Sequence, residues 1–265
     1  RASKMADLDP HHVRKHSAHG GQGKEVIFIR HGQSLANAAG QEADKTPMSE
    51  RWLDAPMTTL GQMQADSWKG VAPTWGVDEI ICSPMSRAME TACRIFQHCD
   101  APIVVTPFAR EGWWHCTENR GRPLAGIYSG TDGASAEKRW PTPLELPGSH
   151  KLRALDGIEG QGLYWDPSSE AAAAHDESML FDRWRGGLEK LKALILASPA
   201  KRVAVVCHWG VIEALTGFDA DNCACVPTLV YQSPNGNGFH WSCSVCPPVI
   251  PHPPLGIRAY DHIFR

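Results

Sequence analysis

Polar residues that can do chemistry follow four short apolar runs of this chain. They comprise two arginines, two histidines and one carboxylate: Arg30, His31, Arg87, Glu111 and His208. Together these side chains suit phosphoryl transfer. Guanidinium groups hold phosphate oxygens with fork-shaped donors, and a neutral imidazole can attack phosphorus and carry the phosphoryl group. A carboxylic acid can protonate the leaving alkoxide and then activate water.

The segment VIFIRHGQSLAN, residues 26–37, holds the densest part of this set. Its apolar run ends on an arginine followed by His31. Nearby arginines would lower the pKa of His31 and keep its lone pair available near neutral pH. Gly32 would let the backbone approach an anion closely. Ser34 and Asn37 fall early in the next helix, where the helix dipole favours an anion, and both are candidate substrate ligands.

The elements that must position these residues alternate between strands and helices. Short runs rich in Val and Ile predict strands at Glu25–Ile29, Glu79–Cys82, Pro102–Thr106 and Arg202–Cys207. Helical spacing predicts helices at Leu60–Trp68, Met85–His98 and Met179–Leu196. The alternation predicts an α/β fold, a three-layer α/β/α sandwich with a mostly parallel central sheet. Ligands of such sheets bind at the carboxyl ends of the strands, so we expect the four polar groups to converge there.

One domain accounts for most of the chain. A length of 265 residues is enough to bury a sizeable core. We expect residues 1–23 to form a flexible N-terminal arm and residues 24–265 to form the domain. Residues 117–176 break the alternation, because they are rich in Gly and Pro and lack clear periodicity. Such a long loop is uncommon in a compact domain, so we predict an insertion that caps the site.

Charge and composition narrow the class of protein. The formal net charge is −3, so nothing indicates nucleic acid or an anionic membrane as a partner. No apolar run reaches the roughly 18 residues that span a bilayer, and no secretory signal is visible. Nine scattered cysteines indicate reduced thiols and a cytoplasmic location. The expected partner is a small phosphorylated molecule or a phosphoprotein, and the oligomeric state cannot be read from the sequence.

Four cysteines near the C-terminus have a spacing similar to that of structural zinc sites: Cys223, Cys225, Cys243 and Cys246. The alternative is that Cys225–Tyr231 and Phe239–Val245 form two antiparallel edge strands, in which buried cysteine is ordinary. We favour the strands and predict no metal and no cofactor.

The polar groups and the segments around them resemble the histidine phosphatase superfamily, in the branch similar to phosphoglycerate mutase. The matching segments are FIRHGQSLAN, MTTLGQMQAD, ICSPMSRAMETA, REG and VVCHWG, at residues 28–37, 57–66, 81–92, 110–112 and 205–210. Their combination in this order is specific to the family. The resemblance covers most of residues 25–116 and 179–217 and leaves out the insertion and the C-terminal tail.

The resemblance implies a metal-independent phosphatase that hydrolyses phosphomonoesters through a phosphohistidine intermediate. It implies that His31 is the nucleophile. The phosphate pocket would be formed by the residues that match the family's binding positions: Arg30, Arg87, His208 and Asn37. Glu111 would be the proton donor, and Glu118, seven residues later, is a rival for that role.

The chain departs from the family's glycolytic mutases. Trp209 follows the second histidine, where Gly is common, and its indole could shape the pocket wall or pack inward. The mutases' Glu-Arg-x-Tyr-Gly segment is missing, and a mutase must hold a second anion and exclude water. Water is therefore the expected acceptor of the phosphoryl group; a mutase-type phosphotransferase and an inactive phosphate- or protein-binding pseudoenzyme remain alternatives.

We expect Trp113, with Trp114, to line an apolar leaving-group pocket. The other interpretation is that these tryptophans pack in the core or in a lid.

Overall fold

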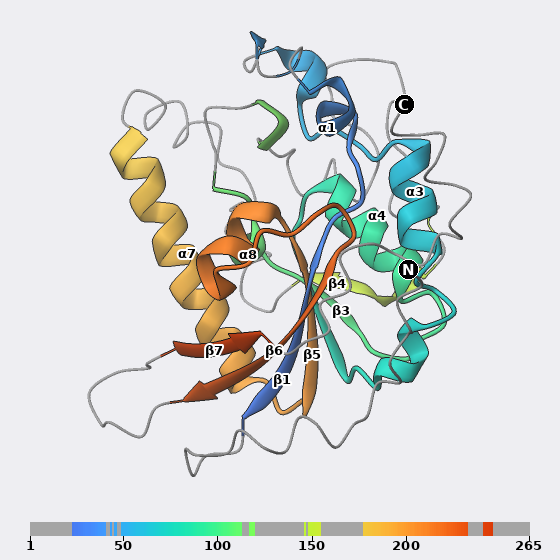
Figure 1. Ribbon diagram of the computed structural model, residues 1–265, viewed down its shortest axis with the longest axis vertical. Coiled ribbons are helices and arrows are strands. Elements are labelled where there is room, and N and C mark those ends of the chain that lie inside the picture. The colour runs from blue at the N-terminus through green and yellow to red at the C-terminus, as the bar shows by residue number, and fades with distance from the viewer. Residues whose placement is uncertain are drawn as a thin grey trace, which may run out of the picture.

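The computed structural model describes residues 23–40, 43, 45, 46, 49–112, 117–119, 146, 148–154, 177–232 and 241–245. These residues build one seven-stranded sheet with helices on both faces (Figure 1). The strands are β1 Lys24–Arg30, β2 Glu79–Cys82, β3 Ile103–Val105, β4 Leu152–Ala154, β5 Arg202–Cys207, β6 Cys225–Gln232 and β7 Trp241–Val245. Their order across the sheet is β4-β3-β2-β5-β1-β6-β7.

Strand pairing is parallel over most of the sheet. The strands β4, β3, β2, β5 and β1 run in one direction, whereas β6 pairs antiparallel with both β1 and β7. Val205 of β5 lies at the centre, opposite Phe28 of β1 and Ile81 of β2. Because the first five strands are parallel, their carboxyl ends share one edge of the sheet, and the polar groups predicted from the sequence follow four of these ends.

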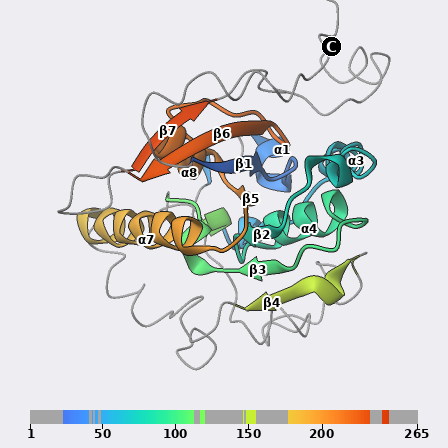
Figure 2. The same cartoon turned by 90° about the horizontal axis from the view of Figure 1, so that it is seen from below.

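Helices cover both faces of the sheet. The described α-helices are α1 Leu35–Ala39, α3 Thr59–Asp66, α4 Ser86–Ile95, α7 Glu177–Ala197 and α8 Trp209–Thr216. The described 3₁₀ helices are η2 Glu50–Trp52, η3 Ala72–Trp75, η4 Pro107–Ala109, η5 Thr117–Asn119 and η7 Ser149–Lys151. Figure 2 shows α3 and α4 on one side of the sheet and α7 and α8 on the other. This arrangement confirms the three-layer sandwich with a mostly parallel sheet.

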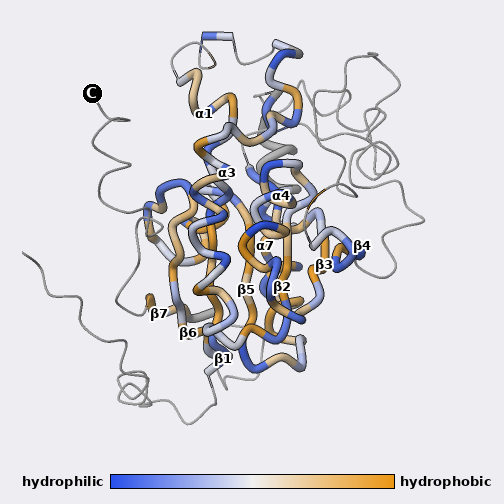
Figure 3. Tube along the Cα trace, turned by 90° about the vertical axis from the view of Figure 1, so that its right-hand side faces the viewer, coloured by the Kyte–Doolittle hydropathy of each residue, from blue (hydrophilic) through white to orange (hydrophobic). Residues whose placement is uncertain are grey.

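Two hydrophobic cores lie on the two faces, and β5 contributes to both. Ala204 and Val206 belong to the core beneath α3 and α4, whereas Val203 and Val205 belong to the core beneath α7 and α8. A strand covered on both faces needs apolar residues at every position, which is why Arg202–Cys207 is a continuous apolar run after its first residue. The strands in the middle of the molecule are accordingly coloured mostly as hydrophobic in Figure 3.

The predicted strands and helices are present, with small differences at their ends, but the edge strand β4 was not predicted. It lies inside the predicted insertion and pairs in parallel with β3. A strand of three residues with the exposed Arg153 at its centre carries no apolar pattern to detect. Nζ of Lys151 donates to the carbonyls of Phe96 and Gln97, which anchors this strand behind α4.

Several predictions concern residues outside the described part of the chain. These are the N-terminal arm up to residue 22, most of the insertion, and the tail after residue 245. The capping role of the insertion therefore stays a prediction. Within the described residues, no helix has the length and apolar character needed to cross a membrane.

Three of the four cysteines with zinc-like spacing are described, and they lie on β6, on β7 and in the loop before β6. Cys223 and Cys225 are buried, whereas Cys243 lies opposite Val230 in the register of β6 and β7. Five residues of extended strand, about 17 Å, separate Cys225 from Val230. Zinc binds each of its sulfur ligands at about 2.3 Å, so Cys225 and Cys243 cannot share one ion. Cys246 lies outside the described residues, which contain no cluster of three metal-binding side chains.

Candidate active site

Side chains from four strand ends meet at the carboxyl edge of the sheet. They come from the ends of β1, β2, β3 and β5 in turn: Arg30, the last residue of β1, with His31, then Arg87 in the first turn of α4, Glu111 after η4, and His208. The ring centroids of His31 and His208 lie 5.0 Å apart, and Arg87 donates hydrogen bonds to both rings. Glu111 contacts Gly210, two residues after His208. The structure thus brings together the five residues that the sequence singled out.

The backbone fixes the tautomer of His31. The side chain is 4% exposed, and Nδ1 lies 2.7 Å from the carbonyl oxygen of Gly32. A carbonyl only accepts, so Nδ1 carries the proton and Nε2 keeps its lone pair. Nε2 accepts a hydrogen bond from Nε of Arg87 at 3.2 Å. Burial, reinforced by Arg87 and Arg30, lowers the pKa of His31 well below its usual value. A neutral imidazole with its lone pair beside a guanidinium suits a nucleophile for phosphate.

His208 lies fully buried beside this pair. Nη2 of Arg87 donates to Nδ1 of His208 at 3.3 Å, so the ring proton lies on Nε2, which donates to Oγ of Ser83 at 2.7 Å. Burial, then Arg87 and His31, lowers the pKa of His208 well below its usual value. Ser83 thereby fixes the orientation of the second imidazole.

The two arginines differ in how completely they are paired. Arg87 is 2% exposed; its Nη1 donates to the carbonyl of Glu118 at 2.8 Å and its Nη2 to Oδ1 of Asn119 at 2.7 Å. Arg30 donates from Nη1 to the carbonyl of Ala220 at 2.8 Å, but its buried Nε has no acceptor in the described part of the chain. Leaving such a group unpaired costs about 1–3 kcal/mol. An anion bound next to Arg30 would remove that cost.

Glu111 is held by backbone N–H groups from two loops. Its side chain is 8% exposed; Oε1 accepts from the N–H of Gly112 at 2.8 Å and Oε2 from the N–H of Gly210 at 3.1 Å. Gly210 lies at the N-terminus of α8, where the helix dipole favours a carboxylate. Burial outweighs these interactions and raises the pKa of Glu111 above its usual value. The group is therefore suited to carrying a proton and releasing it during a reaction.

Helix α7 supports the loop that presents Glu111. Nε1 of Trp184 donates to the carbonyl of Arg110 at 3.2 Å. A Cβ on Gly112 would lie 2.7 Å from the ring of Trp184, so only glycine allows this approach. The helix predicted at Met179–Leu196 thus also supports the site, because its Trp184 holds the loop that carries the carboxylate.

The loop between α8 and β6 closes one side of the site. The carbonyl of Ala220 accepts from Arg30, as described above. Nδ2 of Asn222 donates to the carbonyl of His31 at 3.1 Å and to Oδ1 of Asn37 at 3.2 Å. One loop therefore fixes an arginine, the backbone of the candidate nucleophile and a candidate ligand.

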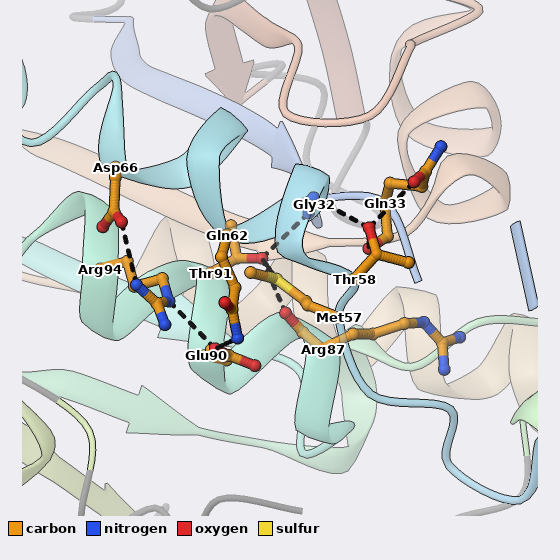
Figure 4. A network of polar contacts seen from close by, with 11 residues as sticks. Gly32, Gln33, Met57, Thr58, Gln62, Asp66, Arg87, Glu90, Thr91 and Arg94 are labelled. Atoms are coloured by element: carbon orange, nitrogen blue, oxygen red, sulfur yellow. Dashed lines mark hydrogen bonds and ion pairs between the residues drawn. The ribbon is translucent and has the colours of Figure 1, made fainter. Parts of the chain in front are cut away.

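Helices α3 and α4 pack against the loop that carries Gly32 (Figure 4). A Cβ on Gly32 would lie 2.6 Å from the carbonyl oxygen of Gly61, at the start of α3. The N–H of Gly32 donates to Oγ1 of Thr91 at 2.9 Å, and Thr91 donates to the carbonyl of Arg87 at 2.7 Å. The structure therefore gives Gly32 a packing role. Its expected role, a close approach of the backbone to an anion, stays a prediction.

A buried carboxylate joins α3 to α4 behind this contact. Glu90 is 3% exposed and accepts from Nε2 of Gln62 at 2.9 Å and from Nε of Arg94 at 3.0 Å. Nη1 of Arg94 also pairs with Asp66 at 3.0 Å (Figure 4). This network fixes α4, the helix that carries Arg87, relative to α3.

Ser34 and Asn37 form the N-terminal cap of α1. Oγ of Ser34 accepts from the backbone N–H of Asn37 at 3.1 Å, and Oδ1 of Asn37 accepts from the N–H of Ser34 at 3.2 Å. Ser34 is fully buried, so its hydroxyl serves the helix. Asn37 is partly exposed, and its Nδ2 takes no part in the cap. Substrate binding by either residue stays a prediction.

The remaining candidate site residues are three tryptophans and Glu118. Trp209 begins α8, is partly exposed and belongs to neither hydrophobic core; its Nε1 donates to Oδ1 of Asp219 at 2.7 Å. Trp113 and Trp114 lie outside the described residues, so the predicted leaving-group pocket is untested. Glu118 contacts Arg87 through its backbone carbonyl, and its side chain is partly exposed.

Four residues that support the site had no role in the sequence prediction: Ser83, Thr91, Asn119 and Asn222. Ser83 and Thr91 lie in the segment ICSPMSRAMETA, so a signal for them existed in the matched pattern. Asn119 lies in the short 3₁₀ helix η5 and Asn222 in the loop between α8 and β6, and both are outside the matching motifs. Their contacts depend on how distant loops meet, which no local pattern reports.

Comparison with known proteins agrees with this geometry. A family model described as histidine phosphatase superfamily (branch 1) matches residues 26–155. Phosphoglycerate mutase-like protein 1 of Arabidopsis thaliana is 32% identical over 77 residues, which cover 28% of this chain and 27% of that protein. The 2,3-bisphosphoglycerate-dependent phosphoglycerate mutase 1 of Gloeobacter violaceus is 30% identical over 108 residues, 38% of this chain and 44% of that protein. The matched segments thus span less than half the length of these relatives.

Solved structures of phosphatases also match the chain. The alpha-ribazole phosphatase of Shigella flexneri has a TM-score of 0.45 and 18% identity, with 83% of this chain and 96% of that chain covered. A mycobacterial glucosyl-3-phosphoglycerate phosphatase has a TM-score of 0.44 and 18% identity, with coverages of 84% and 97%. The family model spans the first histidine, the arginine helix and the candidate acid. Residues 26–155 of this chain belong to the histidine phosphatase superfamily.

Proposed function

We propose that this protein is a phosphatase that hydrolyses phosphomonoesters through a phosphohistidine formed on His31. The observation that carries the proposal is the state of His31. Its proton is fixed on Nδ1 by the carbonyl of Gly32, and its free Nε2 lies against Arg87. A buried neutral imidazole whose lone pair is next to phosphate-binding donors is what attack on phosphorus requires.

The first step transfers the phosphoryl group to His31. Nε2 forms a bond to phosphorus while the bond from phosphorus to the ester oxygen breaks. Glu111, whose pKa is raised by burial, gives its proton to the departing alkoxide. Arg30 and Arg87 supply N–H donors to the phosphoryl oxygens, where negative charge is concentrated in the transition state.

The second step returns the enzyme to its starting state. The carboxylate of Glu111 takes a proton from water, and the oxygen of that water bonds to phosphorus as the bond from phosphorus to Nε2 breaks. Inorganic phosphate leaves, His31 is neutral again and Glu111 is protonated again. The proton on Nδ1 of His31 stays with the Gly32 carbonyl throughout, so the backbone keeps the ring oriented in both steps.

Bound phosphate must replace one contact seen in this structure. Nε of Arg87 donates to Nε2 of His31, the atom that would attack. A phosphate between the two side chains would take this N–H and release the lone pair. Nε of Arg30, which has no acceptor among the described residues, provides a second donor that phosphate would satisfy.

A mutase-type phosphotransferase is the second candidate, because both relatives named above carry mutase names. A phosphoglycerate incubated with a bisphosphate primer would be isomerised by a mutase and hydrolysed by a phosphatase. Release of inorganic phosphate without isomer favours the phosphatase. An inactive pseudoenzyme would bind phosphate and give neither product.

The experiment that tests the proposal measures hydrolysis of an aryl phosphate at slightly acidic pH with a chelator present throughout. Wild type is expected to release phosphate, and His31→Ala is expected to release none. A wild type that binds phosphate without turnover would contradict the proposal that this protein is a phosphatase.

We propose a small phosphorylated molecule or a phosphoprotein as substrate. We also propose a cytoplasmic location, which the free thiols of the described cysteines support.

A further inference from the structure

Asn119 occupies a position that the reaction described above does not use. Its side chain is 3% exposed, although it lies in the short helix η5 within the predicted insertion. Oδ1 of Asn119 accepts from Nη2 of Arg87 at 2.7 Å, and the carbonyl of Glu118 accepts from Nη1 of Arg87 at 2.8 Å. The start of the predicted insertion is thus hydrogen-bonded to Arg87, a residue that would bind phosphate.

These contacts divide the guanidinium of Arg87 between two sets of partners. Nε donates to His31 and Nη2 donates to His208, at the candidate phosphate position. Nη1 and the other hydrogen of Nη2 face Glu118 and Asn119. A guanidinium is planar with donors in a fixed arrangement, so holding one side sets the direction of the other.

We propose that Asn119 is a positioning residue that holds Arg87 from the side of the insertion, so that the guanidinium stays oriented when phosphate replaces the two histidines as its partner. This inference rests on the proposed phosphatase function. Without Asn119, Nη2 would lose an acceptor on that side, and Arg87 could turn when its contacts to His31 and His208 are exchanged for phosphate oxygens.

The amide of Asn119 also suits this position by its charge. Its carbonyl oxygen is a neutral acceptor, so Arg87 keeps its full positive charge for an anion. A carboxylate of the same shape would form an ion pair with Arg87 and repel phosphate. The proposal therefore predicts that Asn119→Asp mainly weakens phosphate binding, whereas Asn119→Ala mainly lowers kcat.

The test compares Asn119→Asp, Asn119→Ala and wild type in binding and in turnover. Binding of inorganic phosphate is measured by calorimetry, and kcat is measured with p-nitrophenyl phosphate. Asn119→Asp keeps the shape and is expected to raise the Kd for phosphate by about tenfold to a hundredfold. Asn119→Ala is expected to lower kcat by about tenfold to a hundredfold, because Arg87 is misplaced, with a smaller effect on Kd. Thermal denaturation checks that each variant is folded.

The control adds the same charge away from the site. Gln97 follows α4, about 15 Å along the chain from Arg87 if the helical rise continues. Gln97→Glu is expected to leave Kd and kcat close to those of wild type. Binding of phosphate by Asn119→Asp as tightly as by wild type, or a normal kcat in Asn119→Ala, would overturn the inference about Asn119. A wild type that neither binds phosphate nor hydrolyses the ester would instead overturn the proposed function.

Discussion

Gly210→Ala should displace the candidate proton donor without unfolding the protein. A Cβ on Gly210 would lie closer to Oε1 of Glu111 than the 3.0 Å that real Cβ atoms keep from other heavy atoms. The carboxylate can yield because it is the end of a flexible side chain, by a shift on the order of 1 Å. Misplacement of a catalytic group by about 1 Å lowers kcat by about 10²-fold. Alanine in a helix is favoured over glycine by about 0.5–1 kcal/mol, so the free energy of unfolding should change little.

The assay compares substrates whose leaving groups need a proton to different extents. Hydrolysis of an alkyl phosphate produces a basic alkoxide and depends strongly on the general acid, whereas p-nitrophenolate leaves readily without one. Gly210→Ala is therefore expected to lose about 10²-fold in kcat on the alkyl ester and much less on p-nitrophenyl phosphate. The difference between the two substrates identifies a defect in proton donation.

The matched control is Gly186→Ala in α7. Gly186 is also a helical glycine, but a Cβ there would meet no heavy atom within 4 Å. This variant is expected to keep the wild-type kcat on both substrates. If folded Gly210→Ala hydrolyses the alkyl ester as fast as wild type does, Glu111 is not the proton donor and Glu118 becomes the candidate.

Three further predictions concern packing and protonation. Gly32→Ala should lower the free energy of unfolding by about 1–3 kcal/mol in urea titrations, because its Cβ would press on the backbone carbonyl of Gly61. Thr91→Val should cost about 1–3 kcal/mol, because it leaves the buried N–H of Gly32 without its acceptor. The pH profile of kcat/KM should be bell-shaped. Activity needs neutral His31, whose pKa is lowered well below 6.5, and protonated Glu111, whose pKa is raised above 4.5. Activity should therefore fall as pH rises through the pKa of Glu111 and fall again as pH drops through that of His31.

Each of these predictions has a control or a contradicting result. Gly70→Ala adds a Cβ in open space, and Thr74→Val removes an exposed hydroxyl, so both should leave stability nearly unchanged. Equal stability of Gly32→Ala and Gly70→Ala would refute the contact with Gly61. Glu111→Gln should remove the alkaline limb of the pH profile. An unchanged alkaline limb in that variant would assign the limb to another group.

The sequence predicts the central sheet well because buried parallel strands must be apolar throughout. After a charged first residue, Arg202–Cys207 and Glu79–Cys82 satisfy that requirement, and the polar residues after them mark the carboxyl edge where a ligand binds. The edge strand β4 escapes prediction since it is short and partly exposed. The local pattern of apolar residues predicts a strand only where burial restricts which residues can occupy it.

Supporting contacts are harder to predict, because they depend on how distant segments meet. The sequence places Gly32 near an anion, but its packing partner, Gly61, comes from a helix nearly thirty residues later. Asn222 bonds to the backbone of His31 across 191 residues of sequence. Nothing in the local sequence around either residue specifies such a partner. Pairs of this kind become visible only when the fold is known.

The most direct test of the central claim is isolation of the phosphorylated enzyme. Wild-type protein mixed with an aryl phosphate and quenched in alkali should carry phosphate on His31, identified by mass spectrometry of the proteolysed protein, because phosphohistidine survives alkali. His31→Asn should carry none and should not turn over. Turnover by wild type with no phosphate on His31, or turnover by His31→Asn, would contradict the assignment of His31 as the nucleophile.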